Sequence, residues 1–157
     1  MIMLKMSDNV PDFCLPNQDE EEICFRDIKG NWIVLYFYPK DSTPGCTTEA
    51  CEFTAAVPDF RNLSATIVGV SPDSPARHRN FIAKQNLKIT LLADEKQELC
   101  NAFGVWQKKK MCGKEYMGVA RSTYIINPSG KIAFFWENVK VKGNVEEVKK
   151  KLEELQK

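Results

Sequence analysis

Cys46 stands where a cysteine can act as a nucleophile. Thr43 and Pro44 are typical of a helix N-cap followed by proline at the first helical position, which puts Cys46 inside the first turn. A thiol there faces unpaired backbone N–H groups and the positive end of the helix dipole, and both favour the reactive thiolate. On this evidence alone, an inert buried cysteine at a helix start is an equal alternative.

Cys51 follows Cys46 at a spacing of five residues. In an intact helix, residues five apart are rotated by about 140° and their Cα atoms lie about 8.6 Å apart. A disulfide usually needs Cα atoms within about 7 Å. A bond between these two cysteines therefore requires the first turns of the helix to unwind; the alternative for Cys51 is a small helical residue without a chemical role.

The remaining cysteines do not form a metal-binding pattern. The six cysteines include no Cys-x-x-Cys pair, and the chain has one histidine, so we expect neither a metal nor a cofactor. The apolar content suffices for a core without disulfides, so we expect the cysteines to be reduced. Cys14 and Cys24 flank a predicted hairpin and could face each other, but small buried hydrophobes are the default for both and for Cys100.

Composition narrows the class of protein. The chain has 157 residues, which fits one domain, and its net charge of +1 gives no general attraction for nucleic acid or an anionic membrane. No apolar stretch reaches the roughly 18 residues of a membrane span, and residues 1–9 lack the features of a secretory signal. We expect a soluble cytoplasmic protein.

The elements that must position Cys46 alternate between strand and helix. Trp32–Tyr38 is continuously apolar and predicts a central strand covered on both faces. It leads to the helix of Cys46 and Cys51, which we expect Pro58 to kink. An N-terminal hairpin is predicted to pair 13–15 with 23–25. A further βαβ unit has strands at 66–70 and 91–93 around a helix at 74–86, and a helix at 95–103 follows it. A second hairpin pairs 122–127 with 131–136, and an amphipathic helix at 145–156 closes the chain. This order predicts an α/β sandwich with a central sheet flanked by helices.

A resemblance to a known family rests on the residues before Cys46. Pro39-Lys40-Asp41-Ser42-Thr43-Pro44-Gly45-Cys46 resembles the Pro-x-x-x-Thr-x-x-Cys signature of peroxiredoxins, and Cys46 with Cys51 is similar to their bacterioferritin-comigratory (PrxQ-type) branch. Segments 10–13, 34–39, 69–74 and 118–123 resemble that branch in order and spacing. The resemblance implies one thioredoxin-like domain over residues 1–157, with a central mixed sheet. It also implies thiol peroxidase activity recycled by thioredoxin or a similar dithiol.

The resemblance also implies roles for individual residues. Cys46 would be the peroxidatic cysteine, which attacks hydrogen peroxide or an organic hydroperoxide and becomes a sulfenic acid, and Cys51 would be the resolving cysteine. The departing oxygen and the sulfur both carry negative charge, which suits a hydroxyl from Thr43 and the positive charge of Arg121. Pro39 would shield the sulfenic acid from water.

Three further residues have competing interpretations. Glu49 matches a frequent acidic position of the branch, where it would help to orient the pocket. The alternative is an ordinary carboxylate near a helix start, which the helix dipole favours. His78 lies between two arginines, so we predict a solvated histidine rather than a partner for a cysteine. Cys112 follows three lysines in a predicted loop, where local charge could make it an alternative resolving cysteine.

Two other functional classes compete with a peroxidase. A thioredoxin-fold disulfide reductase would need the Cys-x-x-Cys pair that is missing. A noncatalytic redox sensor or interaction module, in which Cys46 is oxidised once without turnover, stays open. Because an intramolecular Cys46–Cys51 bond needs no second chain, we expect a monomer whose partners are a hydroperoxide and a dithiol reductant, without nucleic acid or membrane.

Overall fold

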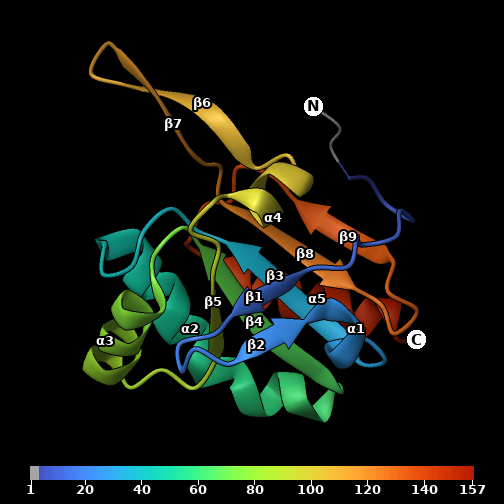
Figure 1. Cartoon of the computed structure of the whole chain (residues 1–157). Helices are drawn as coiled ribbons and strands as arrows, with labels where there is room; N and C mark the ends of the chain where they lie inside the picture. The colour runs from blue at the N-terminus through green and yellow to red at the C-terminus, as the bar shows by residue number, and fades with distance from the viewer. Residues whose placement is uncertain (1–3) are drawn as a thin grey trace.

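The computed structural model describes residues 4–157 and has a five-stranded mixed sheet at its centre (Figure 1). The strand order is β5-β4-β3-β8-β9; β3, β4 and β5 run parallel, and β8 and β9 are antiparallel to their neighbours. This confirms the predicted central mixed sheet. The bounds are β3 Trp32–Phe37, β4 Ala65–Ser71, β5 Thr90–Ala93, β8 Ser122–Ile126 and β9 Ile132–Trp136.

The central strand β3 is buried on both faces, as its unbroken apolar sequence predicts. Ile33, Leu35 and Phe37 enter one hydrophobic core, whereas Val34 and Tyr36 enter the other. This alternation follows from the two-residue period of a strand. The second core also contains Cys46, so the predicted nucleophile lies on the Val34 side of the sheet.

Helices cover both faces of the sheet, as predicted. Helices α2 (Pro44–Asn62), α3 (Pro75–Gln85) and α5 (Asn144–Leu155) contribute to the core of Val34, and α1 (Phe25–Ile28) and α4 (Glu98–Ala102) contribute to the opposite core. Pro58 lies inside α2 without ending it. Helix α4 is shorter than predicted because Gln97 adopts a left-handed conformation with φ of 57° immediately before it.

The N-terminal hairpin is present where the sequence predicts it. It consists of β1 (Cys14–Pro16) and β2 (Glu22–Cys24), in which Cys14 pairs directly with Cys24. These two cysteines form a disulfide. The expectation that both are reduced is therefore wrong, because the antiparallel register, which composition does not reveal, brings their side chains together.

The structure contains a third hairpin, between the two predicted ones, that was not predicted. Strands β6 (Trp106–Met111) and β7 (Lys114–Val119) pair antiparallel and extend beyond the sheet at the top of Figure 1. Cys112 and Gly113 form the turn with φ of 52° and 80°, as a two-residue hairpin turn requires. The loop predicted around the lysines is thus a strand: much of this hairpin is exposed, so it lacks the apolar alternation that marks a half-buried strand.

No helix among residues 4–157 is long and apolar enough to cross a membrane. Residues 1–3, which belong to the stretch 1–9 considered above for a secretory signal, lie outside the described part of the chain.

The packing around Gly69 leads to a prediction about stability. A Cβ atom on Gly69 would lie 2.8 Å from Cδ2 of Leu91 and 2.9 Å from Cζ of Tyr36, both of which are buried. We expect Gly69→Ala to lower the free energy of unfolding by about 1–3 kcal/mol, because a packed core cannot absorb the added methyl group. Urea denaturation measures this change. The exposed Thr66→Ala on the same strand is the control, and an equal effect of the two substitutions would contradict the prediction.

Candidate active site

The topology brings three separate segments together at the carboxyl end of β3. The loop 38–43 follows β3 and leads into α2, which begins at Pro44 and carries Cys46 in its first turn, as predicted. Strand β8 runs antiparallel to β3 with Ser122 opposite Phe37. Arg121, which immediately precedes β8, therefore lies beside the start of α2 although it is 75 residues from Cys46 in sequence.

Two kinds of donor surround the sulfur of Cys46. The helical backbone hydrogen bond from the N–H of Thr47 to the carbonyl of Thr43 leaves the preceding N–H groups of the first turn, including that of Cys46, without an intrahelical acceptor. Nη2 of Arg121 lies 3.3 Å from Sγ of Cys46. The Cys46 side chain is 1% exposed, so water screens these interactions little. The arrangement stabilises negative charge on this sulfur.

Arg121 is itself held by a buried carboxylate. Nη1 of Arg121 donates to Oε1 of Glu49 at 2.6 Å, and Nδ2 of Asn144 donates to the other oxygen at 3.2 Å. Glu49 lies one helical turn after Cys46 and is fully buried. A Cβ on Gly45 would lie 3.3 Å from Nη2 of Arg121, so glycine leaves space for the guanidinium. Glu49 thus has the contacts of an orienting residue.

Burial changes the acidity of Glu49. Removal from water raises the pKa of Glu49 to about 7, although the charge of Arg121 and its hydrogen bond act in the opposite direction. Both oxygens of Glu49 accept a hydrogen bond, one from Arg121 and one from Asn144, and a carboxylate that only accepts hydrogen bonds is in the environment of its ionised form. Glu49 therefore exchanges a proton near neutral pH, and its ionised form is the one that pairs with Arg121.

Thr43 and Pro39 lie beside the site but do not contact the sulfur through a described hydrogen bond. Thr43 is the N-cap residue of α2, as predicted, but its hydroxyl donates to the carbonyl of Lys40 at 2.9 Å and caps no helical N–H. Pro39, Thr43 and Arg121 together line one wall of a cleft. The roles predicted for Thr43 and Pro39 remain predictions.

Cys51 lies further along the same unbroken helix. It is partly exposed, and its Sγ is 3.9 Å from Oε1 of Gln85 on α3. Both Cys46 and Cys51 are free thiols, and α2 is continuous between them. Bond formation between them therefore requires local unwinding, as the spacing indicates.

His78 is buried, so the prediction of a solvated histidine is wrong. Its Nδ1 lies 2.6 Å from Oδ2 of Asp41, and its Nε2 lies 3.0 Å from the carbonyl oxygen of Leu92. Adjacent helical residues point in different directions, so flanking arginines do not decide the side on which His78 lies. The backbone N–H of Asp41 also donates to Asp73 at 2.8 Å. His78 and Asp73 thus anchor the loop that leads to Cys46.

Some residues of the site carried no recognised signal in the sequence. Asp41 stands inside the Pro39–Cys46 signature, and this position could have marked it as a residue of the site. Asn144 is 95 residues from its partner Glu49, so no local pattern connects the two. Among the described residues, the hydroxyls of Tyr36 and Thr123 are buried without a hydrogen-bond partner. These two residues are opposite each other on β3 and β8.

The cleft beside Cys46 is large and has one apolar wall. Its volume is about 720 Å³. The β6–β7 hairpin contributes Trp106, Met111, Tyr116 and Met117 to its lining, and the loop 38–43 contributes Pro39, Lys40 and Thr43. Of these hairpin residues, Met111, Tyr116 and Met117 are exposed large hydrophobic side chains. The cleft has space for a substrate larger than hydrogen peroxide.

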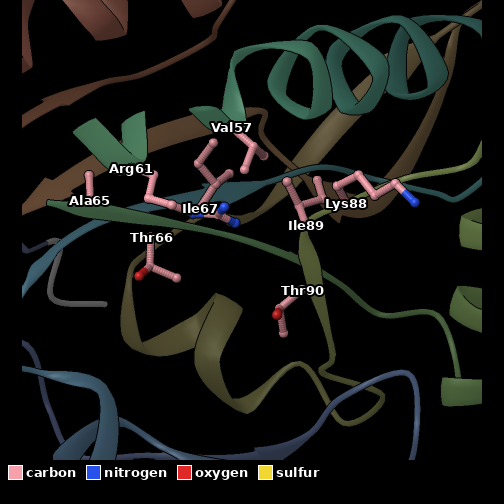
Figure 2. Close-up of a pocket in the computed structure, with 8 residues that line it drawn as sticks. All are labelled: Val57, Arg61, Ala65, Thr66, Ile67, Lys88, Ile89 and Thr90. Carbon is pink, nitrogen blue, oxygen red and sulfur yellow. The ribbon is translucent and has the colours of Figure 1, made fainter. Parts of the chain in front are cut away.

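A smaller hollow lies at the opposite end of the parallel strands and lacks the features of an active site. Figure 2 shows it between the end of α2 and the beginnings of β4 and β5, with a volume of about 160 Å³. The hydroxyls of Thr66 and Thr90 point away from the side of the sheet on which Val57 and Arg61 lie. Its polar groups do not converge, and no cysteine or carboxylate lines it.

The other free cysteines differ in environment. Cys100 is fully buried, and burial together with Asp94 raises the pKa of its thiol well above the usual range. It therefore stays protonated and agrees with the expected small hydrophobe. Cys112 is exposed at the tip of the β6–β7 hairpin.

Comparisons with known proteins agree with this geometry. Residues 6–135 match the AhpC/TSA family. Peroxiredoxin Bcp of Bacillus subtilis is 46% identical over 152 residues, which are 97% of each chain. The solved structure of Xanthomonas campestris Peroxiredoxin Q has a TM-score of 0.91 at 41% identity over 98% of both chains. A structure of the Xanthomonas campestris bacterioferritin comigratory protein, described for alkyl peroxide reduction activity, has a TM-score of 0.91 at 40% identity over 98% of both chains. The predicted thioredoxin-like fold is confirmed.

Proposed function

Since the chain belongs to the AhpC/TSA family and is a peroxiredoxin of the bacterioferritin-comigratory type, a thiol peroxidase, we propose that Cys46 is its peroxidatic cysteine. The observation that carries this proposal is the buried sulfur of Cys46 in the first turn of α2 with Arg121 at 3.3 Å. The Cys46 thiolate attacks a peroxide oxygen, the O–O bond breaks, and the departing oxygen takes a proton to become water or an alcohol. The sulfur becomes a sulfenic acid.

The proposed substrates are hydrogen peroxide and organic hydroperoxides. The cleft of about 720 Å³ and the apolar side chains of the β6–β7 hairpin favour organic hydroperoxides as well as the smaller substrate. The Xanthomonas campestris bacterioferritin comigratory protein, which has the same fold, is described for alkyl peroxide reduction. In this proposal the Thr43 hydroxyl, which donates to the carbonyl of Lys40 in the free site, turns to donate to the peroxide, and Pro39 limits the access of water to the sulfenic acid.

We further propose that Cys51 resolves the sulfenic acid. Its thiolate attacks the sulfur of Cys46, water leaves, and an intramolecular disulfide forms after the first turns of α2 unwind. A dithiol reductant such as thioredoxin then restores both thiols. Because both cysteines belong to one chain, a monomer suffices for the cycle. We propose that this monomer acts in the cytoplasm.

Disulfide mapping tests the proposal directly. We expect one equivalent of hydrogen peroxide, followed by thiol blocking and peptide mass spectrometry, to reveal a Cys46–Cys51 bond. The variant C14S/C24S is measured beside the intact protein, so that the redox state of that pair does not affect the count of peroxide equivalents. A bond from Cys46 to Cys112 or between two chains would reassign the resolving cysteine. An unmodified Cys46 would favour the noncatalytic alternative.

Removing the resolving thiol separates the two chemical steps. We expect Cys51→Ser to keep the first oxidation of Cys46 and to accumulate the sulfenic acid, because no nearby thiol condenses with it. Labelling with dimedone and intact mass measure this species, and turnover with a dithiol reductant is expected to fall sharply. Cys112→Ser is the matched control and should keep full turnover; the reverse pattern would assign Cys112 as the resolving cysteine.

The unwinding of α2 leads to a separate prediction about amide exchange. In the Cys46–Cys51 disulfide form, backbone amides of residues 46–51 should exchange with solvent faster than in the reduced form, because their helical hydrogen bonds break. Hydrogen exchange followed by mass spectrometry compares the two forms. Residues of α5 serve as the reference, and unchanged protection of 46–51 in the disulfide form would contradict the required opening.

A further inference from the structure

A second pair of cysteines lies outside the Cys46 site, in the N-terminal hairpin. Cys14 on β1 and Cys24 on β2 are opposite each other and disulfide-bonded. We infer that they form a second dithiol–disulfide couple of this protein, which a dithiol reductant opens by attack on the sulfur of Cys14. The couple uses neither Cys46 nor Cys51, so it does not depend on the function proposed for those residues.

The two sulfurs differ in accessibility. Cys14 is exposed, whereas Cys24 is only 4% exposed. A cavity of about 320 Å³ is lined by Cys14, by apolar side chains that include Phe13 and Leu99, and by the carboxylates Asp12 and Glu98; Cys24 is not among its lining residues. Thiol–disulfide exchange depends on which sulfur an incoming thiolate can reach. Exchange is therefore directed to Cys14.

The charges around the two sulfurs also differ. Nη1 of Arg26 lies 3.7 Å from Sγ of Cys14, and Oε1 of Glu22 lies 3.6 Å from Sγ of Cys24. Arg26, which also pairs with Asp12 at 2.8 Å, attracts an incoming thiolate and stabilises a thiolate on Cys14. Glu22, whose carboxylate lies within 4.8 Å of both sulfurs, can accept a hydrogen bond from a Cys24 thiol. It disfavours a thiolate on Cys24 and so slows the departure of that sulfur when Cys14 is attacked. The pair thus has one accessible nucleophilic sulfur and one sheltered sulfur that favours the thiol form.

The exchange balances in both directions. A reductant thiolate attacks Sγ of Cys14, the S–S bond breaks, and the sulfur of Cys24 leaves with the electron pair and takes a proton. The second thiol of the reductant, as its thiolate, then displaces Cys14 as a thiolate beside Arg26. In the reverse direction a hydroperoxide oxidises the Cys14 thiolate to a sulfenic acid and is reduced to an alcohol or water; the Cys24 thiol condenses with it and water leaves.

The loop that this bond closes contacts α3 and the edge strand β5 of the central sheet. The carbonyl of Gln18 accepts a hydrogen bond from Nη1 of Arg79 at 2.9 Å, and its side-chain oxygen accepts one from the N–H of Leu91 at 3.2 Å. Asn17 forms a bridge to Leu92 on β5. Reduction frees the base of the loop, so we expect the amide of Leu91 to exchange faster in the dithiol form.

The double variant C46S/C51S tests the couple without interference from the proposed catalytic thiols. The oxidised protein is incubated with dithiothreitol and a metal chelator, and free thiols are alkylated at intervals under native conditions. We expect Cys14 and Cys24 to become labelled together, at a rate well above that of global unfolding. Labelling that is no faster than unfolding would overturn the inference, because it would make the bond a structural one.

The attacked sulfur and the two charges are tested with glutathione, a monothiol that leaves a mixed disulfide. We expect this adduct on Cys14, and an adduct on Cys24 would overturn the assignment. In the same background Arg26→Gln should slow exchange and Glu22→Gln should speed it, each by about threefold because both groups are exposed. Lys29→Gln, an exposed charge outside the contacts of either sulfur, is the matched control; rates unchanged by both test substitutions would remove the assigned roles of Arg26 and Glu22.

Discussion

Replacing Cys46 with serine is expected to abolish peroxide turnover at this site, with a loss of at least about 10³-fold. A serine hydroxyl stays protonated at neutral pH and cannot be oxidised to a species that condenses with a thiol. Peroxide consumption coupled to a dithiol reductant measures the change. The Cys14–Cys24 pair remains in this variant, so comparison with the triple variant C14S/C24S/C46S separates any slow consumption of peroxide by that pair.

Two controls make the Cys46 result specific. Cys112→Ser removes an exposed thiol at a hairpin tip and should leave the rate unchanged. Thermal unfolding of Cys46→Ser shows whether the fold is retained, since the substituted side chain is buried. Full turnover by Cys46→Ser would exclude Cys46 as the peroxidatic residue.

Arg121→Gln is expected to slow the oxidation of Cys46 by about 10²–10³-fold, because a preorganised charge that faces the reacting sulfur and the departing oxygen is lost. Stopped-flow measurement of the first oxidation isolates this step from recycling. Arg121→Lys should recover only part of the rate. One ammonium group cannot reproduce the fork that contacts Glu49 at 2.6 Å and Cys46 at 3.3 Å.

The same substitution also leaves Glu49 buried without its cationic partner. An unpaired buried charge costs about 3–5 kcal/mol when it cannot take a proton. Burial already raises the pKa of Glu49 from 4.5 to about 7, and loss of Arg121 removes the main opposing influence. The folded state then binds a proton that the unfolded state releases, so the stability of Arg121→Gln should fall as pH rises above 4.5 and recover as pH falls.

The double variant R121Q/E49Q separates catalysis from folding. It removes the buried charge, so we expect its stability to lose most of this dependence on pH. Its rate of Cys46 oxidation should stay low, since the guanidinium is still absent. Recovery of the rate together with stability would show that Arg121 acts only through the fold and not on the reacting sulfur.

Local sequence was sufficient to place the proposed nucleophile Cys46 and the main elements. The N-cap and proline before Cys46 place it in the first turn of α2 whatever else surrounds it, and the apolar run at Trp32–Tyr38 needs cover on both faces. The spacing of Cys46 and Cys51 likewise implies separation on an intact helix. These features depend on the geometry of a helix or a strand over a few residues. The local amino-acid sequence determines that geometry directly.

Contacts between distant segments were decided only by the tertiary structure. The antiparallel pairing of β8 with β3 sets Arg121 beside Cys46, and the start of α5 supplies Asn144 to Glu49. His78 reads as a surface residue between two charges, yet its helix turns it toward Asp41.

The cysteines show the same division. The sequence by itself determined that Cys14 and Cys24 flank a hairpin, but register decided that they bond, because a shift of one residue would turn one side chain to the other face of the ladder. Local geometry thus placed Cys46 at the start of its helix, whereas the packing of segments far apart in sequence decided which charges surround it and which other cysteines are paired.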